Sequence, residues 1–315
     1  MENNLQNKIE SILNNGVGVN LYFALRNQDQ VVIKRADLET GETQNNLRRQ
    51  FISLLETEIM ESQDCEVEEL SSTDERNNIF YHYDYLKFPE KLQYFAEFDY
   101  QKEYDMFSFG KDDLSKIEAY IIVLGSREHY CVLYKKFYPV FLIGRGSYFL
   151  KLKSKSRFSE FDEDIIRISK DYHFLMVDGE IYIKDLKILE QYGGFKKVIE
   201  SEAEQTLEEI EKMDLLEETE GLSETIKENL SFARKLGKIR KTSPVISLHI
   251  PNNQVIEFSK THPGIKGKLR YSEDGNKILL TTKKSQEEFL KLLDDSFLIS
   301  ELTKYYYASM TKKKV

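Results

Sequence analysis

The ten residues FLMVDGEIYI, at positions 174–183, place an Asp-Gly pair between two short apolar runs. This arrangement favours a two-residue β-hairpin, because both turn positions need a positive φ, which Gly and Asp adopt more readily than most residues. Further strand-like runs precede the hairpin at 119–124, 130–137 and 148–152. The middle third of the chain is therefore predicted to form a mostly antiparallel sheet.

Helical and strand-like patterns alternate before this sheet. Apolar residues recur at helical spacing over 4–14, and again from Thr43 onward. Strand-like runs at 19–25 and 31–34 lie between these two helices, and another covers 79–85. The pattern predicts an N-terminal portion in which helices pack on strands.

Helices are predicted after the sheet. One apolar stripe occupies 195–210 and a second occupies 222–236. From residue 200 to residue 228 there are 12 acidic residues against two lysines. The simplest interpretation is the solvated face of a long helical hairpin. The alternative is a surface for self-association or for docking onto a basic partner.

The last part of the chain mixes both kinds of element. A strand is expected at 246–249, and a hairpin over 266–280 around an Asp-Gly turn. Helices are expected at 287–294 and 298–308, where apolar residues return at helical spacing.

Together these patterns predict an α+β fold, with a central mostly antiparallel sheet, a long acidic helical hairpin and flanking helices. We expect an N-terminal α/β portion at 1–114 and a core domain at 115–315. Within the core domain, the sheet is expected at 115–185, the helical hairpin at 186–241 and a basic part at 242–315.

Charge is divided unevenly along the chain. The formal net charge is −9, but residues 234–315 hold 17 Lys or Arg and 8 Asp or Glu, a net +9, so the first 233 residues carry −18. Residues 130–158 contain no acidic residue, and their cations are interleaved with Tyr and Phe. Cations among aromatics are typical of surfaces that contact the phosphates and bases of nucleic acids.

Three basic clusters are the candidate nucleic-acid contacts. In the first, the four cations of residues 151–157 alternate, so on one strand they would share a face and could follow a phosphate backbone. The alternative is an edge strand protected by lysines. The candidates are Lys135, Lys136, Arg145, Lys151, Lys153, Lys155 and Arg157 in the first cluster, Arg234, Lys235, Lys238, Arg240 and Lys241 in the second, and Lys266, Lys268 and Arg270 in the third.

The second cluster lies at a helix C-terminus and holds more cations than the helix dipole accounts for. The third repeats the same-face strand pattern of the first. Since no motif for reading base edges accompanies these clusters, we expect contact with double-stranded DNA that does not depend on its sequence.

A metal-dependent nuclease is the alternative from a different functional class. Such enzymes need carboxylates to hold Mg²⁺ and a lysine near the attacking water. Asp185 and Lys187 have a suitable offset, but they are expected at a helix start, and Asp178 is explained by the hairpin turn. The His and Cys residues show no metal-ligand spacing. We therefore expect no catalytic residues, no metal and no cofactor.

The sequence also carries an expectation about location. The N-terminus lacks the basic start and apolar run of a signal peptide, and no window approaches the ~18 apolar residues of a membrane span. We expect a reduced cytoplasmic protein, which would reach a membrane only through a partner.

The segment from Phe161 to Ile183 and the segment from Leu293 to Thr303 resemble the domain of the KwaB family, soluble proteins of the Kiwa anti-phage defence systems. The similarity covers residues 115–310. It implies a cytosolic effector that is held at the inner membrane by the multi-spanning protein KwaA and that binds phage DNA. It implies no set of catalytic residues.

The two apolar stripes of the acidic helices further suggest a homodimer or higher homo-oligomer. One more alternative is an interaction protein whose basic face binds acidic protein or anionic lipid instead of DNA.

Overall fold

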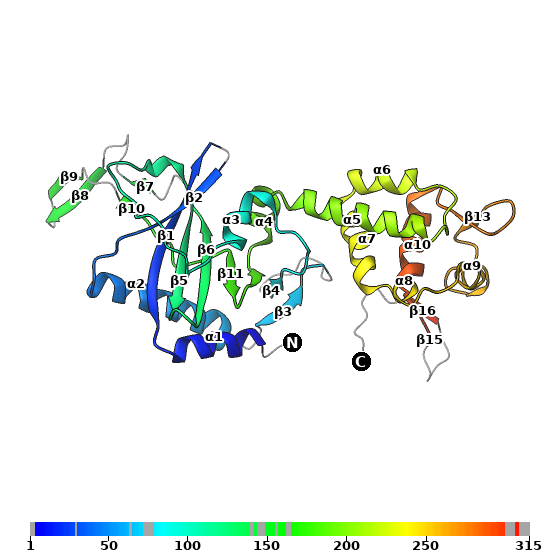
Figure 1. Ribbon diagram of the computed structural model, residues 1–315, viewed down its shortest axis with the longest axis horizontal. Coiled ribbons are helices and arrows are strands. Elements are labelled where there is room, and N and C mark those ends of the chain that lie inside the picture. The colour runs from blue at the N-terminus through cyan, green and yellow to red at the C-terminus, as the bar shows by residue number, and fades with distance from the viewer. Residues whose placement is uncertain are drawn as a thin grey trace. The chain divides into compact units, whose positions relative to one another are not determined.

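The computed structural model describes residues 4–28, 30–62, 65–71, 79–138, 142–143, 149–154, 157–161, 165–299 and 306–308 (Figure 1). The chain forms two compact units, Met1–Gly193 and Gly194–Val315. Among the described residues, none of the helices combines the length and the apolar character that a membrane crossing requires.

The first unit is built on an eight-stranded sheet with the strand order β2-β1-β5-β6-β11-β12-β4-β3. Every neighbouring pair is antiparallel except β3 and β4. The predicted α+β fold with a mostly antiparallel sheet is confirmed. The strands are β1 (Gly18–Asn27), β2 (Gln30–Arg35), β3 (Glu66–Glu69), β4 (Ile79–His82), β5 (Ile117–Gly125), β6 (Tyr130–Lys136), β11 (Phe174–Val177) and β12 (Glu180–Ile183).

The predicted hairpin lies in the interior of this sheet. Val177 pairs with Glu180 across the turn, and Asp178 and Gly179 have φ angles of 51° and 77°. Both turn residues thus adopt the left-handed conformation that the Asp-Gly pair favours.

The sheet combines strands that precede residue 114 in the sequence with strands that follow it. β1 pairs with β5 along its length, from Gly18 opposite Gly125 to Leu25 opposite Ile117. Because this ladder needs both strands, the structure does not separate 1–114 from 115–185, and the boundary between the compact units falls at Gly193 instead.

Helices cover both faces of the sheet. On one face, α1 and α2 pack on the sheet, and Ile9, Phe51 and Leu55 join Leu21 and Ile122 in a buried core (Figure 1). On the other face, the ring centroid of Phe95 in α3 lies 5.1 Å from that of Tyr134 and 5.9 Å from that of Phe174. The helices of this unit are α1 (Asn4–Asn14), α2 (Glu42–Leu55), η1 (Glu56–Met60), η2 (Glu90–Leu92), α3 (Gln93–Ala96), η3 (Leu114–Lys116) and α4 (Leu186–Gly193).

Four short antiparallel pairs and several helices complete the two units. The remaining strands pair as β7 (Leu142–Ile143) with β10 (Ile165–Ile166), β8 (Phe149–Ser154) with β9 (Arg157–Phe161), β13 (Arg270–Tyr271) with β14 (Ile278–Leu279), and β15 (Phe297–Ile299) with β16 (Tyr306–Ala308). The helices of the second unit are α5 (Phe195–Lys212), α6 (Glu220–Glu228), α7 (Leu230–Thr242), α8 (Pro244–Ser247), α9 (Asn252–Thr261) and α10 (Lys283–Leu293).

The acidic segment differs from the single hairpin that the sequence predicted. Its second arm is divided at Asn229, where φ is −130° and ψ is 97°, and the Asn229 side chain accepts a hydrogen bond from Phe232 N. The partner that packs along acidic α5 is mainly α7, which is basic at its C-terminal end. The hairpin therefore pairs an acidic helix with a basic one.

Two predictions near the C-terminus are wrong. The segment 246–249 overlaps helix α8 instead of forming a strand, because the Ser243 side chain caps the helix through Ile246 N and Pro244 occupies its first turn. The described parts of 298–308 are β15 and β16, not a helix. Asp295, with φ of 48°, redirects the chain immediately after α10.

Candidate nucleic-acid interface

Lys135 of the first basic cluster is a structural residue. It is only 7 % exposed, and its ammonium forms an ion pair with Asp171. Lys184 binds the other oxygen of Asp171 at 2.9 Å and Glu58 at 2.6 Å. Burial opposes ionisation of Asp171, but the hydrogen bonds from the two lysines outweigh it and hold the pKa of Asp171 below its ordinary value. The charge of Lys135 is therefore used inside the fold, and Lys135 does not join the exposed cations of the candidate interface.

Lys136 projects toward aromatic rings. Its ammonium lies 4.3 Å from the ring centroid of Tyr192 in α4 and 6.0 Å from that of Tyr138. Burial is the main cause that lowers the pKa of Lys136. The interleaving of cations and aromatics in the sequence thus produces a cation–π contact within the protein at this position.

The rest of the first cluster does not form the expected row on one strand. Lys151 and Lys153 belong to β8, but the chain reverses after Ser154, which pairs with Arg157 at the start of β9. β8 thus ends before the fourth cation of the expected row, Arg157, which begins β9. Arg145 and Lys155 lie outside the described residues, as do the side chains of the other three.

The five residues of the second cluster belong to α7 and occupy several sides of it. Gly237 and Arg240 face α5, where Arg240 Nε lies 2.9 Å from Glu209 Oε1. Arg234, Lys238 and Lys241 follow one another at spacings of four and three residues, so they form a row about 100° around the helix from the α5 contact. Lys235 lies beside that row and is exposed.

The third cluster lies mostly in turns. Lys266 and Lys268 follow α9 in a turn, and only Arg270 belongs to a strand, so the expected same-face pattern is wrong. Lys268 pairs at 3.1 Å with buried Glu288, which Lys291 also reaches at 2.9 Å. Lys266 and Arg270 are exposed, and the described part of the structure gives neither an ion pair.

The residues considered for a nuclease site have local structural roles. Asp185 caps α4, since its Oδ1 accepts from Lys187 N at 3.0 Å and from Ile188 N at 3.4 Å. The predicted helix start is confirmed. Within the described ranges, no group of three or more His, Cys, Asp or Glu side chains is arranged to hold a metal ion.

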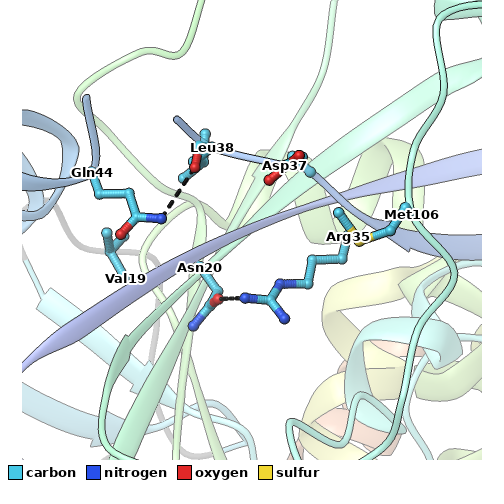
Figure 2. A pocket seen from close by; sticks show the side chains of 8 residues that line it. Val19, Asn20, Arg35, Asp37, Leu38, Gln44 and Met106 are labelled. Atoms are coloured by element: carbon cyan, nitrogen blue, oxygen red, sulfur yellow. Dashed lines mark hydrogen bonds between the residues drawn. The ribbon is translucent and has the colours of Figure 1, made fainter. Parts of the chain in front are cut away.

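The first unit also contains a charged hollow that no sequence pattern predicted. It has a volume of about 530 Å³, and its walls include Arg35 of β2, Tyr22 of β1, Lys102, Tyr104 and Arg127. A smaller hollow of about 180 Å³ shares Arg35 and is shown in Figure 2. The only local signal was the density of aromatic and charged residues near residue 100, because the other contributors are far apart in the sequence.

Comparison with known proteins agrees with the family resemblance. A family model described as Kiwa protein KwaB-like matches residues 114–303, more than half of the chain. The Kiwa protein KwaB of Escherichia coli O55:H7 (strain RM12579 / EPEC) is 29 % identical over 322 residues, which cover 99 % of this chain and 98 % of that protein. No solved structure is significantly similar to the chain described here. The chain belongs to the KwaB-like family.

Proposed function

We propose that this protein is a component of Kiwa anti-phage defence that binds phage double-stranded DNA without sequence preference and without catalysing a reaction on it. Support for the defence role comes from membership of the KwaB-like family and from a relative named Kiwa protein KwaB that aligns over almost the whole chain. Support for DNA binding comes from the distribution of charge over the second unit.

The observation that carries the proposal is the basic row on α7. Arg234, Lys238 and Lys241 extend over about 10 Å along the helix axis, at a rise of about 1.5 Å per residue. On this side of the helix Lys235 and Lys241 are exposed, whereas Arg234 and Lys238 are half-buried. Phosphates of a duplex can approach the exposed cations along this length, and each neutralised phosphate releases counterions. The contact between Arg240 and Glu209 on the neighbouring side holds the row away from α5.

The acidic residues of α5 and α6 restrict the side from which a duplex can approach the second unit. A duplex that approaches the carboxylates is repelled, whereas one that approaches the basic side of α7 is attracted, and the two effects act over about one Debye length. An acidic protein can bind DNA under these conditions because the local field outweighs the net charge.

Mobility-shift measurements with duplexes of unrelated sequence, over a range of salt concentrations, test DNA binding. We expect equal affinity for each duplex and a steep fall with salt, with a slope of about −0.9 for each phosphate contacted. Combined Lys235→Glu, Lys238→Glu and Lys241→Glu changes should weaken binding at least about tenfold and flatten the slope.

The matched control combines Lys212→Glu, Lys227→Glu and Lys284→Glu, three exposed lysines of the same unit. It makes the same change in net charge but leaves the α7 row intact. If both triple variants lose the same affinity, total charge and not the α7 surface governs binding. If the unaltered protein shifts no duplex, its basic face serves another acidic partner.

The absence of catalysis has its own test. Supercoiled plasmid incubated with the protein and Mg²⁺ or Mn²⁺ should remain intact. Nicking that disappears in an Asp185→Ala variant would instead make the protein a metal-dependent nuclease.

The proposal also includes a membrane partner and self-association. We propose that KwaA recruits the protein to the inner membrane, and that the acidic surface of α5 and α6 serves docking or homo-oligomer formation. Co-expression followed by membrane fractionation tests the first point. Light scattering at micromolar concentration tests the second, and a monomer would remove self-association.

A further inference from the structure

The larger hollow in the first unit is built by segments that are tied together by hydrogen bonds. Arg35 at the end of β2 donates its backbone N–H to Asp105 O at 2.8 Å, and its own carbonyl accepts from Phe107 N at 2.8 Å. The segment around Met106 is thereby held at the end of β2. Tyr100 and Tyr104 contact Asn20 and Tyr22 of β1, whose neighbours Val19, Leu21 and Phe23 belong to the core that contains α1 and α2. The hollow is a fixed part of the fold of this unit.

Positive charge dominates its walls. Arg35, Lys102 and Arg127 line the hollow together with one carboxylate, that of Glu103. All four side chains are exposed, and none of the three cations forms an ion pair with another residue in the described part of the chain. Unpaired cations that converge on a concave surface favour an anion.

One of these cations is oriented by a relay of hydrogen bonds. Arg35 Nη2 donates to Asn20 Oδ1 at 2.7 Å, and Asn20 Nδ2 donates to the Tyr100 hydroxyl at 2.7 Å. Figure 2 shows the guanidinium of Arg35 directed at Asn20. Because only part of the guanidinium is used, its remaining N–H groups can bind a phosphate, for which their planar geometry is suited.

Tyrosine rings form the other wall. Tyr104 stacks on Phe98 with ring centroids 5.4 Å apart and planes 11° apart, and Tyr22 meets both rings edge-on. Lys102 lies over Tyr104, with its ammonium a loose 5.9 Å from the ring centroid. A flat heterocycle could replace this contact, because base–aromatic stacking is more favourable than an exposed cation–π pair.

We propose that this hollow binds a nucleotide, with its phosphate at Arg35 and Arg127 and its base against Tyr104. The volume of about 530 Å³ is suited to a ligand of that size. The tyrosines distinguish a nucleotide from inorganic phosphate, since a simple anion would leave them unused. Glu103 can accept hydrogen bonds from a sugar hydroxyl or an exocyclic amino group.

The nucleotide has two possible sources with the same chemistry: a free nucleotide, or the terminal nucleotide of a nucleic-acid strand. The site is distinct from the basic row of α7, which belongs to the other compact unit. Apart from Arg127, the residues that carry the proposal also precede the segment matched by the family model.

Calorimetric titration of the full-length protein with AMP, ATP and inorganic phosphate tests the proposal. We expect both nucleotides to bind and phosphate to bind at least about tenfold more weakly, because it lacks the stacking contact. Arg35→Gln should weaken nucleotide binding at least about tenfold through loss of a charge-assisted hydrogen bond. Tyr104→Leu should reduce the difference in affinity between nucleotides and inorganic phosphate.

Arg49→Gln is the matched control, since Arg49 is an exposed arginine of α2 outside the hollow and should leave binding unchanged. Competition with single-stranded oligonucleotides separates the sources. Displacement by a 5′-phosphorylated strand but not by its 5′-hydroxyl form identifies a strand end, and displacement by neither identifies a free nucleotide.

Three results would overturn the proposal: no binding of either nucleotide at millimolar concentration, equal affinity for phosphate and nucleotides, or equal affinity in the Arg35→Gln variant and the unaltered protein. Thermal melting of each variant shows whether it is folded. Retention on duplex DNA should stay unchanged in both hollow variants, so failure here leaves the DNA-binding proposal standing.

Discussion

Lysines serve opposite purposes in the two compact units. In the sheet unit, Lys135 of β6 is buried and neutralised by Asp171, at a distance of 36 residues along the chain. In the helical unit, Lys235 of α7 is exposed beside a row of further cations. A strand in the middle of a sheet has both faces covered, whereas a helix packed mainly on one neighbour leaves much of its circumference to solvent. The element that carries a charge therefore decides whether the charge can meet a partner.

The strongest test of this contrast is removal of each lysine. We expect Lys135→Ala to lower the free energy of unfolding by about 3 kcal/mol, because the buried lysine side chain leaves a cavity and Asp171 loses one of its two lysine partners. Lys235→Ala should change it by less than about 0.5 kcal/mol, as is usual for exposed sites. Urea denaturation of both variants measures the difference, and equal values would mean that Lys135 is not held as described.

The electrostatics of the same buried region make a second prediction, on pH. His173 lies beside Lys135 in the sheet unit and accepts a hydrogen bond from Lys136 N through Nδ1 at 3.1 Å. Burial, then the positive charge of Lys135, lowers the pKa of His173 to about 4, although Asp185 and Asp171 act in the opposite direction. The folded protein therefore keeps His173 neutral, with Nδ1 free to accept.

The sign follows from proton uptake. Between the ordinary pKa of about 6.5 and the folded pKa, only the unfolded chain binds this proton, so stability falls as the pH is lowered. We expect His173 to remove about 2 kcal/mol of stability by pH 5, and almost nothing above about pH 7. His173→Asn keeps an acceptor but does not titrate, so its unfolding free energy should fall less over this range than that of the unaltered protein. Parallel pH curves would contradict the assignment.

Local chemistry explains which parts of the fold could be predicted from the sequence. The turn at Asp178 and Gly179 depends on two adjacent residues and was confirmed. The pairing of β1 with β5 depends on residues about 100 positions apart, and no local pattern reports it. The expected helix at 298–308 was wrong because Phe297–Ile299 and Tyr306–Ala308 pair with each other as strands, and local helical spacing does not report that pairing.

The same reasoning applies to the sites. The basic row of α7 could be found because a single helix carries all of its members. The true position of Lys135 could not, because Asp171 and Lys184 come from later segments. The larger hollow in the first unit is lined by side chains from separate segments of the chain, so only folding brings them together. They include Tyr22, Arg35, Tyr104 and Arg127.

The smallest expected effect concerns how firmly α7 is held against α5, on which the direction of its basic row depends. Gly237 lies in the middle of α7, and an added Cβ would meet Glu202 Cβ at 3.5 Å, an ordinary van der Waals contact. Since glycine weakens a helix interior and alanine fits this space, Gly237→Ala should stabilise the protein by about 0.5 kcal/mol. Thermal melting measures this change. Destabilisation would instead mean that the two helices lie closer than the structure shows and that the row of cations is turned to a different side. In that case the Gly237→Ala variant should also lose affinity for DNA, whereas a helix that merely gains rigidity should bind DNA as before.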